Sequence, residues 1–70
     1  MYAIVTLQVN GTPYELPAGA TVADLLATMN IAVRHVAVEV NLEIVPRALH
    51  NSRVLSGTDR VEVVTLVGGG

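Results

Sequence analysis

The sequence predicts an α+β fold, in which a mixed sheet of about five strands has one main helix packed across it. Three patterns support this class. Residues 3–9 alternate apolar and polar side chains, as a half-buried strand does. Residues 22–29 carry apolar side chains at the spacing of one helix face. Further alternating runs follow this segment without the repeated strand–helix order of a parallel α/β protein.

The first strand predicts a hairpin. Asn10-Gly11 follows it, and both residues tolerate the positive φ angles of a type I′ turn. Residues 12–17 should therefore return antiparallel as a second strand. Pro13 and Pro17 cannot donate ladder hydrogen bonds, which places this strand at an edge of the sheet.

Capping signals mark both ends of the helix. Thr21 is a residue type that caps helix N-termini, and Asp24 three positions later can reach back to the free amides. Asn30 is a suitable left-handed stop. The helix therefore begins near residue 22, and its apolar stripe belongs to the core: Val22, Leu25, Leu26 and Met29.

The second half of the chain predicts three more strands, over residues 36–40, 43–45 and 60–67. Leu42 is a poor residue for positive φ, so the Asn41-Leu42 turn is either strained or of another type. Residues 47–53 form at most one helical turn, and residues 56–59 predict a turn. If the first and last strands lie parallel at the centre of the sheet, the fold is a β-grasp.

Composition narrows the function classes. The net charge is −2, and four spread arginines form no basic face for nucleic acid: Arg34, Arg47, Arg53 and Arg60. The chain has no lysine for a Schiff base and no cysteine for a thiolate nucleophile or metal ligand. No stretch has the ~18 apolar residues of a membrane span, and the start has no signal-peptide pattern, so we expect a cytoplasmic protein.

Side chains for catalysis or metal binding are scarce. His35 and His50 lie far apart in the sequence, without companion ligands, and are expected at the surface. Six carboxylates are interpreted as solvated surface groups and caps: Glu15, Asp24, Glu39, Glu43, Asp59 and Glu62. The chain is therefore not expected to be an enzyme or to bind a cofactor by itself.

The most distinctive chemical group is the carboxylate of Gly70. The chain divides into a domain of residues 1–67 and a flexible tail, Gly68-Gly69-Gly70, which is slim enough to thread a narrow channel. The alternative is an inert chain end. The last predicted strand turns apolar on both faces, so Val64 and Leu66 are either a patch that docks partners or side chains buried beneath a loop.

Six segments together resemble the ThiS family of sulfur carriers in thiamine biosynthesis. The most specific are Ile-Val-Pro-Arg at residues 44–47 and the glycine tail; the full set is residues 9–11, 16–26, 36–41, 44–47, 57–64 and 67–70. The chain departs from the family pattern at Asn41-Leu42, where relatives usually have Asn-Gly, and it lacks an aromatic residue after Arg47.

The resemblance implies a ubiquitin-like β-grasp protein that works with partners. An E1-like, ThiF-type adenylyltransferase would use ATP to adenylate Gly70, with Gly68 and Gly69 as the tail that its channel accepts. A sulfur donor such as a cysteine desulfurase would supply the sulfur of a thiocarboxylate. A ThiG-type thiazole synthase would then take that sulfur.

Two alternatives remain open at this point. The small subunit of molybdopterin synthase is similar in fold and in its Gly-Gly end, but the Ile-Val-Pro-Arg segment and the short length argue against it. The other alternative is a β-grasp binding or regulatory module with an inert tail.

Overall fold

The computed structural model describes residues 3–32 and 35–65. In chain order its elements are β1 (Ile4–Val9), β2 (Thr12–Pro17), α1 (Val22–Thr28), β3 (Val36–Val40), β4 (Glu43–Ile44), the 3₁₀ helix η2 (Arg47–Leu49) and β5 (Arg60–Thr65). Each strand predicted from the sequence and the predicted helix are present, and their limits differ by at most one residue where the structure describes them. The last two residues predicted for the final strand lie outside the described residues.

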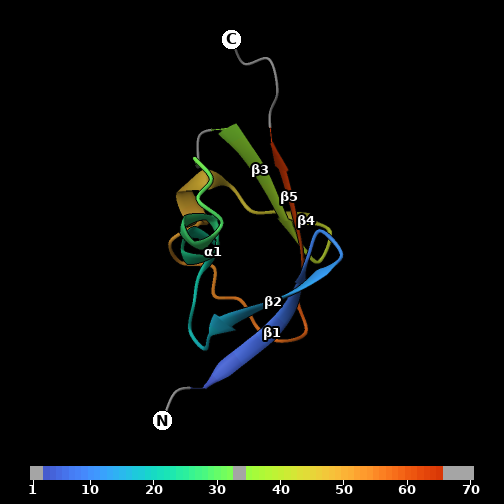
Figure 1. Ribbon diagram of the computed structural model, residues 1–70. Coiled ribbons are helices and arrows are strands. Elements are labelled where there is room, and N and C mark those ends of the chain that lie inside the picture. The colour runs from blue at the N-terminus through green and yellow to red at the C-terminus, as the bar shows by residue number, and fades with distance from the viewer. Residues whose placement is uncertain (1–2, 33–34, 66–70) are drawn as a thin grey trace.

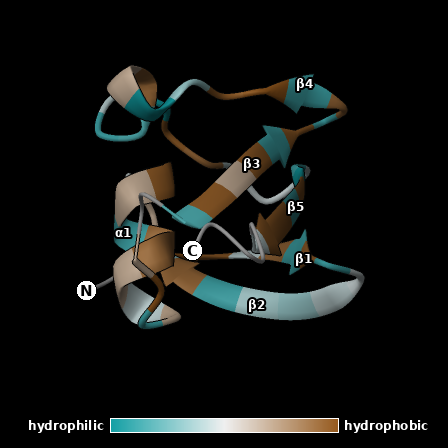
Figure 2. Ribbon diagram, turned by 90° about the horizontal axis from the view of Figure 1, so that it is seen from above, coloured by the Kyte–Doolittle hydropathy of each residue, from teal (hydrophilic) through white to brown (hydrophobic). Residues whose placement is uncertain are grey.

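The strands form one sheet in the order β2-β1-β5-β3-β4. The central pair, β1 and β5, is parallel, and the remaining pairs are antiparallel. Helix α1 and η2 lie on one side of the sheet, and no described helix covers the other side (Figures 1 and 2). The central parallel pair and the single crossing helix confirm the predicted β-grasp arrangement.

The core lies between α1 and the sheet. The alternation of each strand directs one set of aliphatic side chains toward the helix, while Val22, Leu25 and Leu26 face them from α1 and are completely buried. Met29 is partly buried against the same cluster, as predicted. The sheet contributes a larger set: Leu7, Val9, Leu16, Val36, Val38, Val40, Val61 and Val63.

Both ends of α1 have the predicted caps. Thr21 Oγ1 accepts from the Asp24 amide at 3.2 Å, and the Asp24 carboxylate accepts from the Thr21 amide at 2.9 Å, which completes a capping box. Asn30 adopts a φ of 59° just past the C-cap. No helix in residues 3–32 or 35–65 is long and apolar enough to cross a bilayer.

The two hairpin turns share a backbone conformation but not a sequence. Asn10 and Gly11 have φ angles of 52° and 80°, which confirms the predicted type I′ geometry. Asn41 and Leu42 take φ angles of 53° and 71°, so of the two expectations for this turn the strained one is correct. A left-handed leucine costs roughly 1–2 kcal/mol.

The expectation that both histidines lie at the surface is wrong for His50. This residue is only 4% exposed, because residues 45–55 fold back against the start of α1, where the His50 carbonyl accepts from the Ala23 amide at 2.9 Å. Nε2 donates to the Val45 carbonyl at 3.0 Å, and Nδ1 is buried without a partner among the described residues. His35 is exposed, as expected.

Asp59 is likewise buried, although the sequence grouped it with solvated carboxylates and caps. It caps the turn before β5: one oxygen accepts from the Ser56 amide at 2.8 Å and the other from Asn41 Nδ2 at 2.9 Å. Arg53 lies 3.7 Å away. Burial by itself raises the pKa of this carboxyl, but these hydrogen bonds and the Arg53 charge outweigh burial and hold the pKa below its ordinary value of 3.8.

We therefore predict that Asp59 makes folding sensitive to acid. Because the pKa is lower in the folded state than in the unfolded chain, the stabilisation is complete above about pH 5 and is lost as the pH falls through 3.8 toward the folded-state value. Asp59→Asn should cost about 1.5–3 kcal/mol at pH 7 and flatten the acid limb of the stability curve. Urea unfolding between pH 2 and 7 measures both, and an unchanged acid limb would contradict the prediction.

Candidate functional site

The face of the sheet away from α1 is the candidate site, because β5 leads from it toward the glycine tail. Strand alternation places one set of side chains here, and the pairing registers align them across the strands. From the centre of the sheet toward β4, this face carries Arg60, Glu62, Val64, Ala37, Glu39 and Ile44.

Val64 is the apolar part of this face nearest the end of the described chain. Its side chain is 53% exposed and pairs with Ala37 across β3. Ile44 on β4 is also exposed and lies opposite Glu39. Of the two alternatives for Val64, the structure supports an exposed patch rather than burial beneath a loop. Leu66, Gly68, Gly69 and Gly70 lie outside the described residues.

Two carboxylates face each other between these apolar side chains. Glu39 of β3 and Glu62 of β5 are directly paired in the antiparallel ladder. Like charges at this position destabilise a sheet. Within the described residues, the one ion pair joins Arg53 to Asp59, so neither glutamate is neutralised by a basic group there. We call these five residues the sheet patch: Ala37, Glu39, Ile44, Glu62 and Val64.

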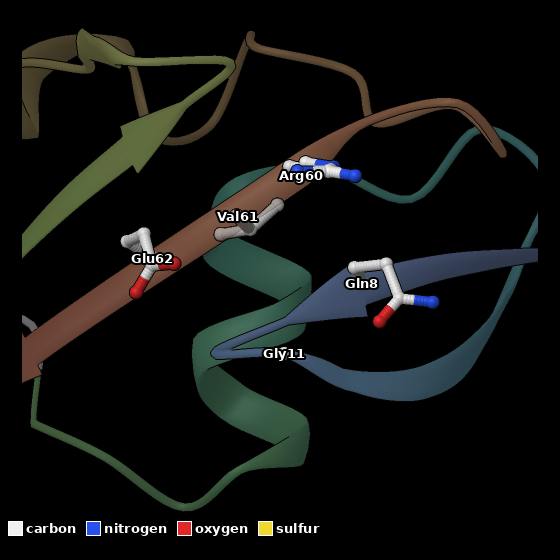
Figure 3. Close-up of a pocket in the computed structure, with 5 residues that line it drawn as sticks. All are labelled: Gln8, Gly11, Arg60, Val61 and Glu62. Atoms are coloured by element: carbon white, nitrogen blue, oxygen red, sulfur yellow. The ribbon is translucent and has the colours of Figure 1, made fainter.

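A shallow hollow of about 310 Å³ lies beside the patch, where the first hairpin turns away from β5. Figure 3 shows Gln8, Arg60 and Glu62 on the near side of the strands, with α1 behind them. Gly11 and Val61 complete its lining. The polar side chains of this lining are one cation, one anion and one amide.

The sheet patch could be predicted only in part. The pattern of the last strand made Val64 a candidate for an exposed patch. The same analysis interpreted Glu39 and Glu62 as ordinary solvated carboxylates. Their juxtaposition depends on the β3–β5 register, which pairs residues 23 positions apart. The signal present in the sequence was that alternation places each glutamate on the exposed side of its own strand.

The chain is similar to known proteins along nearly its whole length. The family model described as "ThiS family" matches residues 7–70. A solved structure, the thiamine biosynthesis protein (ThiS) from Geobacter metallireducens, superimposes with a TM-score of 0.80 at 30% identity, covering 94% of this chain and all of that one. The uncharacterised protein ycf40 of Pyropia yezoensis is 33% identical over 70 residues, covering all of this chain and 99% of that protein.

A third relative is a longer protein. The thiazole synthase of Magnetococcus marinus is 39% identical over 64 residues, which are 91% of this chain but 20% of the synthase. The similarity therefore lies in one region of that protein.

The like-charge pair predicts a substitution that stabilises the fold. Glu62→Gln should raise the free energy of unfolding by about 0.2–1 kcal/mol at low salt, because it removes the repulsion from Glu39. The gain should shrink near 1 M salt, where the Debye length is about 3 Å. Glu15→Gln is the matched control, since Glu15 is an exposed strand glutamate on the same face but pairs with Thr6. Equal gains in both variants would show that the pairing has no effect.

Proposed function

The chain belongs to the ThiS family, and from this premise we propose that it is a sulfur carrier for the thiazole ring of thiamine. The observation that carries the proposal is the shared region of thiazole synthase. A domain like this one is joined, in the Magnetococcus marinus protein, to the enzyme that the proposal makes its acceptor. The same observation favours thiamine over the molybdenum cofactor as the pathway.

We propose that the reacting group is the carboxylate of Gly70. An oxygen of this carboxylate attacks the α-phosphorus of ATP held by an adenylyltransferase, and pyrophosphate leaves. The outer sulfur of a persulfide on a donor such as a cysteine desulfurase then attacks the acyl carbon, the carbon–oxygen bond to AMP breaks, and an acyl disulfide forms. A thiol of a partner protein attacks the donor's sulfur in this bond, so that a disulfide forms between the partners' sulfurs and the thiocarboxylate is released. In this scheme the partners hold the ATP and the catalytic groups, and this chain contributes a slim tail and a docking surface.

The sheet patch has the composition expected of that docking surface. Val64, Ala37 and Ile44 offer apolar contact, while Glu39 and Glu62 present paired negative charge. A basic side chain of the partner between the two carboxylates would turn their mutual repulsion into attraction. The patch also continues along β5 toward the tail, so docking there would hold the carboxylate near the partner's nucleotide.

This docking proposal predicts that Val64→Glu weakens the complex with the adenylyltransferase by tenfold or more, because it adds a third negative charge to the apolar part of the patch. The melting curve should stay nearly unchanged, since Val64 is 53% exposed. Ile4→Glu is the control: Ile4 is 61% exposed on the same face but, from the β1–β5 register, about 26 Å from Val64 along the strands. Equal losses in both variants, measured by calorimetric titration, would argue against a localised docking surface.

The tail proposal predicts that a bulky residue near its end blocks activation. Extended backbone covers at most ~3.3–3.6 Å per residue, so three glycines span about 10 Å, and a side chain within that span would collide with a narrow channel. Gly69→Val should abolish ATP–pyrophosphate exchange with the adenylyltransferase and leave the melting temperature unchanged. Wild-type chain should exchange one oxygen for sulfur, as read by intact mass.

A chain extended by one residue beyond Gly70 provides the opposing test. The extension converts the Gly70 carboxylate to an amide and moves the terminal carboxylate one residue further from the nucleotide. The extended chain should therefore be neither adenylated nor thiolated. If the extended chain reacts at the wild-type rate without trimming, Gly70 is not the reacting residue. If the wild-type chain is neither adenylated nor thiolated, the carrier function is wrong and an inert tail on a binding module takes its place. Sulfur transfer to the large subunit of molybdopterin synthase, but not to thiazole synthase, would redirect the proposal to the molybdenum cofactor.

A further inference from the structure

The strand that leads to the tail loses its neighbour on one side. β1 pairs with β5 only at Gln8–Arg60 and Val9–Val61, and then turns back into the hairpin. β5 continues to Thr65, where β3 still pairs with it on the other side. Figure 1 shows β5 extending well beyond the hairpin turn. Past Val61, the β1 side of β5 therefore has no strand to bind it within the described residues.

The side chain of Asn10 occupies the position that the missing strand would take. Its Nδ2 donates to the Val63 carbonyl at 3.1 Å, and its Oδ1 accepts from the Val63 amide at 2.8 Å. The Asn10 backbone amide also donates to the Val61 carbonyl at 2.8 Å. The carboxamide, which presents an N–H donor and an oxygen acceptor to Val63 in one plane, thus acts as one more peptide unit of β1.

Few residues could do this at position 10. The turn requires positive φ, which asparagine and glycine tolerate well. Glycine has no side chain to bind Val63, and aspartate would place an oxygen against the Val63 carbonyl in place of the donor. Asparagine satisfies the turn and the strand together. A type I′ turn alone would be equally well formed by Gly-Gly, so the bonds to Val63 give this asparagine a second role.

We propose that Asn10 is a positioning residue for the activation of Gly70, an inference that rests on the proposed function. Val63 stands seven positions before Gly70. The two side-chain bonds fix Val63 on the side of β5 that has no strand beside it. If these bonds were lost, residues 62–65 would be held in the sheet by β3 alone, and the end of β5 that leads to Gly70 would be less well fixed. The carboxylate would then meet the partner's nucleotide correspondingly less often.

The test compares two asparagines with the same local role. Asn10→Gly keeps the positive φ of the first hairpin and removes the two side-chain hydrogen bonds to Val63. Asn41→Gly keeps the positive φ of the second hairpin and removes two hydrogen bonds at the other end of β5, to the Arg60 amide at 2.9 Å and to the Asp59 carboxylate at 2.9 Å. Both variants lose side-chain bonds to β5, but only Asn10→Gly loosens the half that leads to the tail.

Two measurements are made on each variant. The first is amide hydrogen exchange of the isolated chain, in which Asn10→Gly should speed exchange at Val63 by more than tenfold beyond any global loss of stability. The second is steady-state ATP–pyrophosphate exchange with the adenylyltransferase. Asn10→Gly should raise the KM for this chain at least twofold and leave kcat unchanged, whereas Asn41→Gly should change neither.

The outcomes separate the inference from the function beneath it. An unchanged KM in Asn10→Gly, or an equal rise in Asn41→Gly, overturns the positioning role while adenylation of the wild-type chain stands. Unchanged hydrogen exchange at Val63 overturns the positioning role as well, because the side-chain bonds of Asn10 would then not hold this part of β5. If the wild-type chain is not adenylated at all, the proposed function fails and the inference falls with it.

Discussion

The hydrogen bonds that hold β5 between two hairpins are the constraint on which the rest of the structure depends. Each hairpin is a local unit, and a two-stranded hairpin by itself is marginally stable in water. β5 joins them: Asn10 binds Val61 and Val63 from one side, and Asn41 binds Arg60 from the other. The buried carboxylate of Asp59 fixes the turn directly before β5 and so helps to place this strand between the two hairpins. The core face and the sheet patch both follow from this placement.

The elements could be predicted because their signals are local. Asn10-Gly11 determines the first hairpin, Thr21 and Asp24 determine the start of the helix, and alternation marks the strands within one or two residues. Periodicity could not show that the first and last strands pair in parallel, because it contains no information about which strands become neighbours. The left-handed Leu42 shows a long-range contribution overriding a local preference, because Asn41 is held by Arg60 and Asp59.

The features that could not be predicted from the sequence depend on contacts between distant segments. His50 looked like a surface residue because its segment has no pattern, yet that segment packs against α1 and supplies carbonyls to the amides of Val22 and Ala23. Glu39 and Glu62 become a pair only through the β3–β5 register. The role of Gly68, Gly69 and Gly70 stays a prediction, supported by a family match that includes them.

The prolines of β2 have a consequence for how the molecule behaves in a crowded cell. Val9 and Thr12 flank the two-residue turn and exchange hydrogen bonds, so residues 13, 15 and 17 direct their backbone groups away from β1. Pro13 and Pro17 occupy two of these positions, which leaves Glu15 as the outward amide donor of the strand. A second chain that tried to extend the sheet at this edge would find an interrupted ladder and a negative charge. The edge therefore resists the strand-by-strand growth that leads to aggregates.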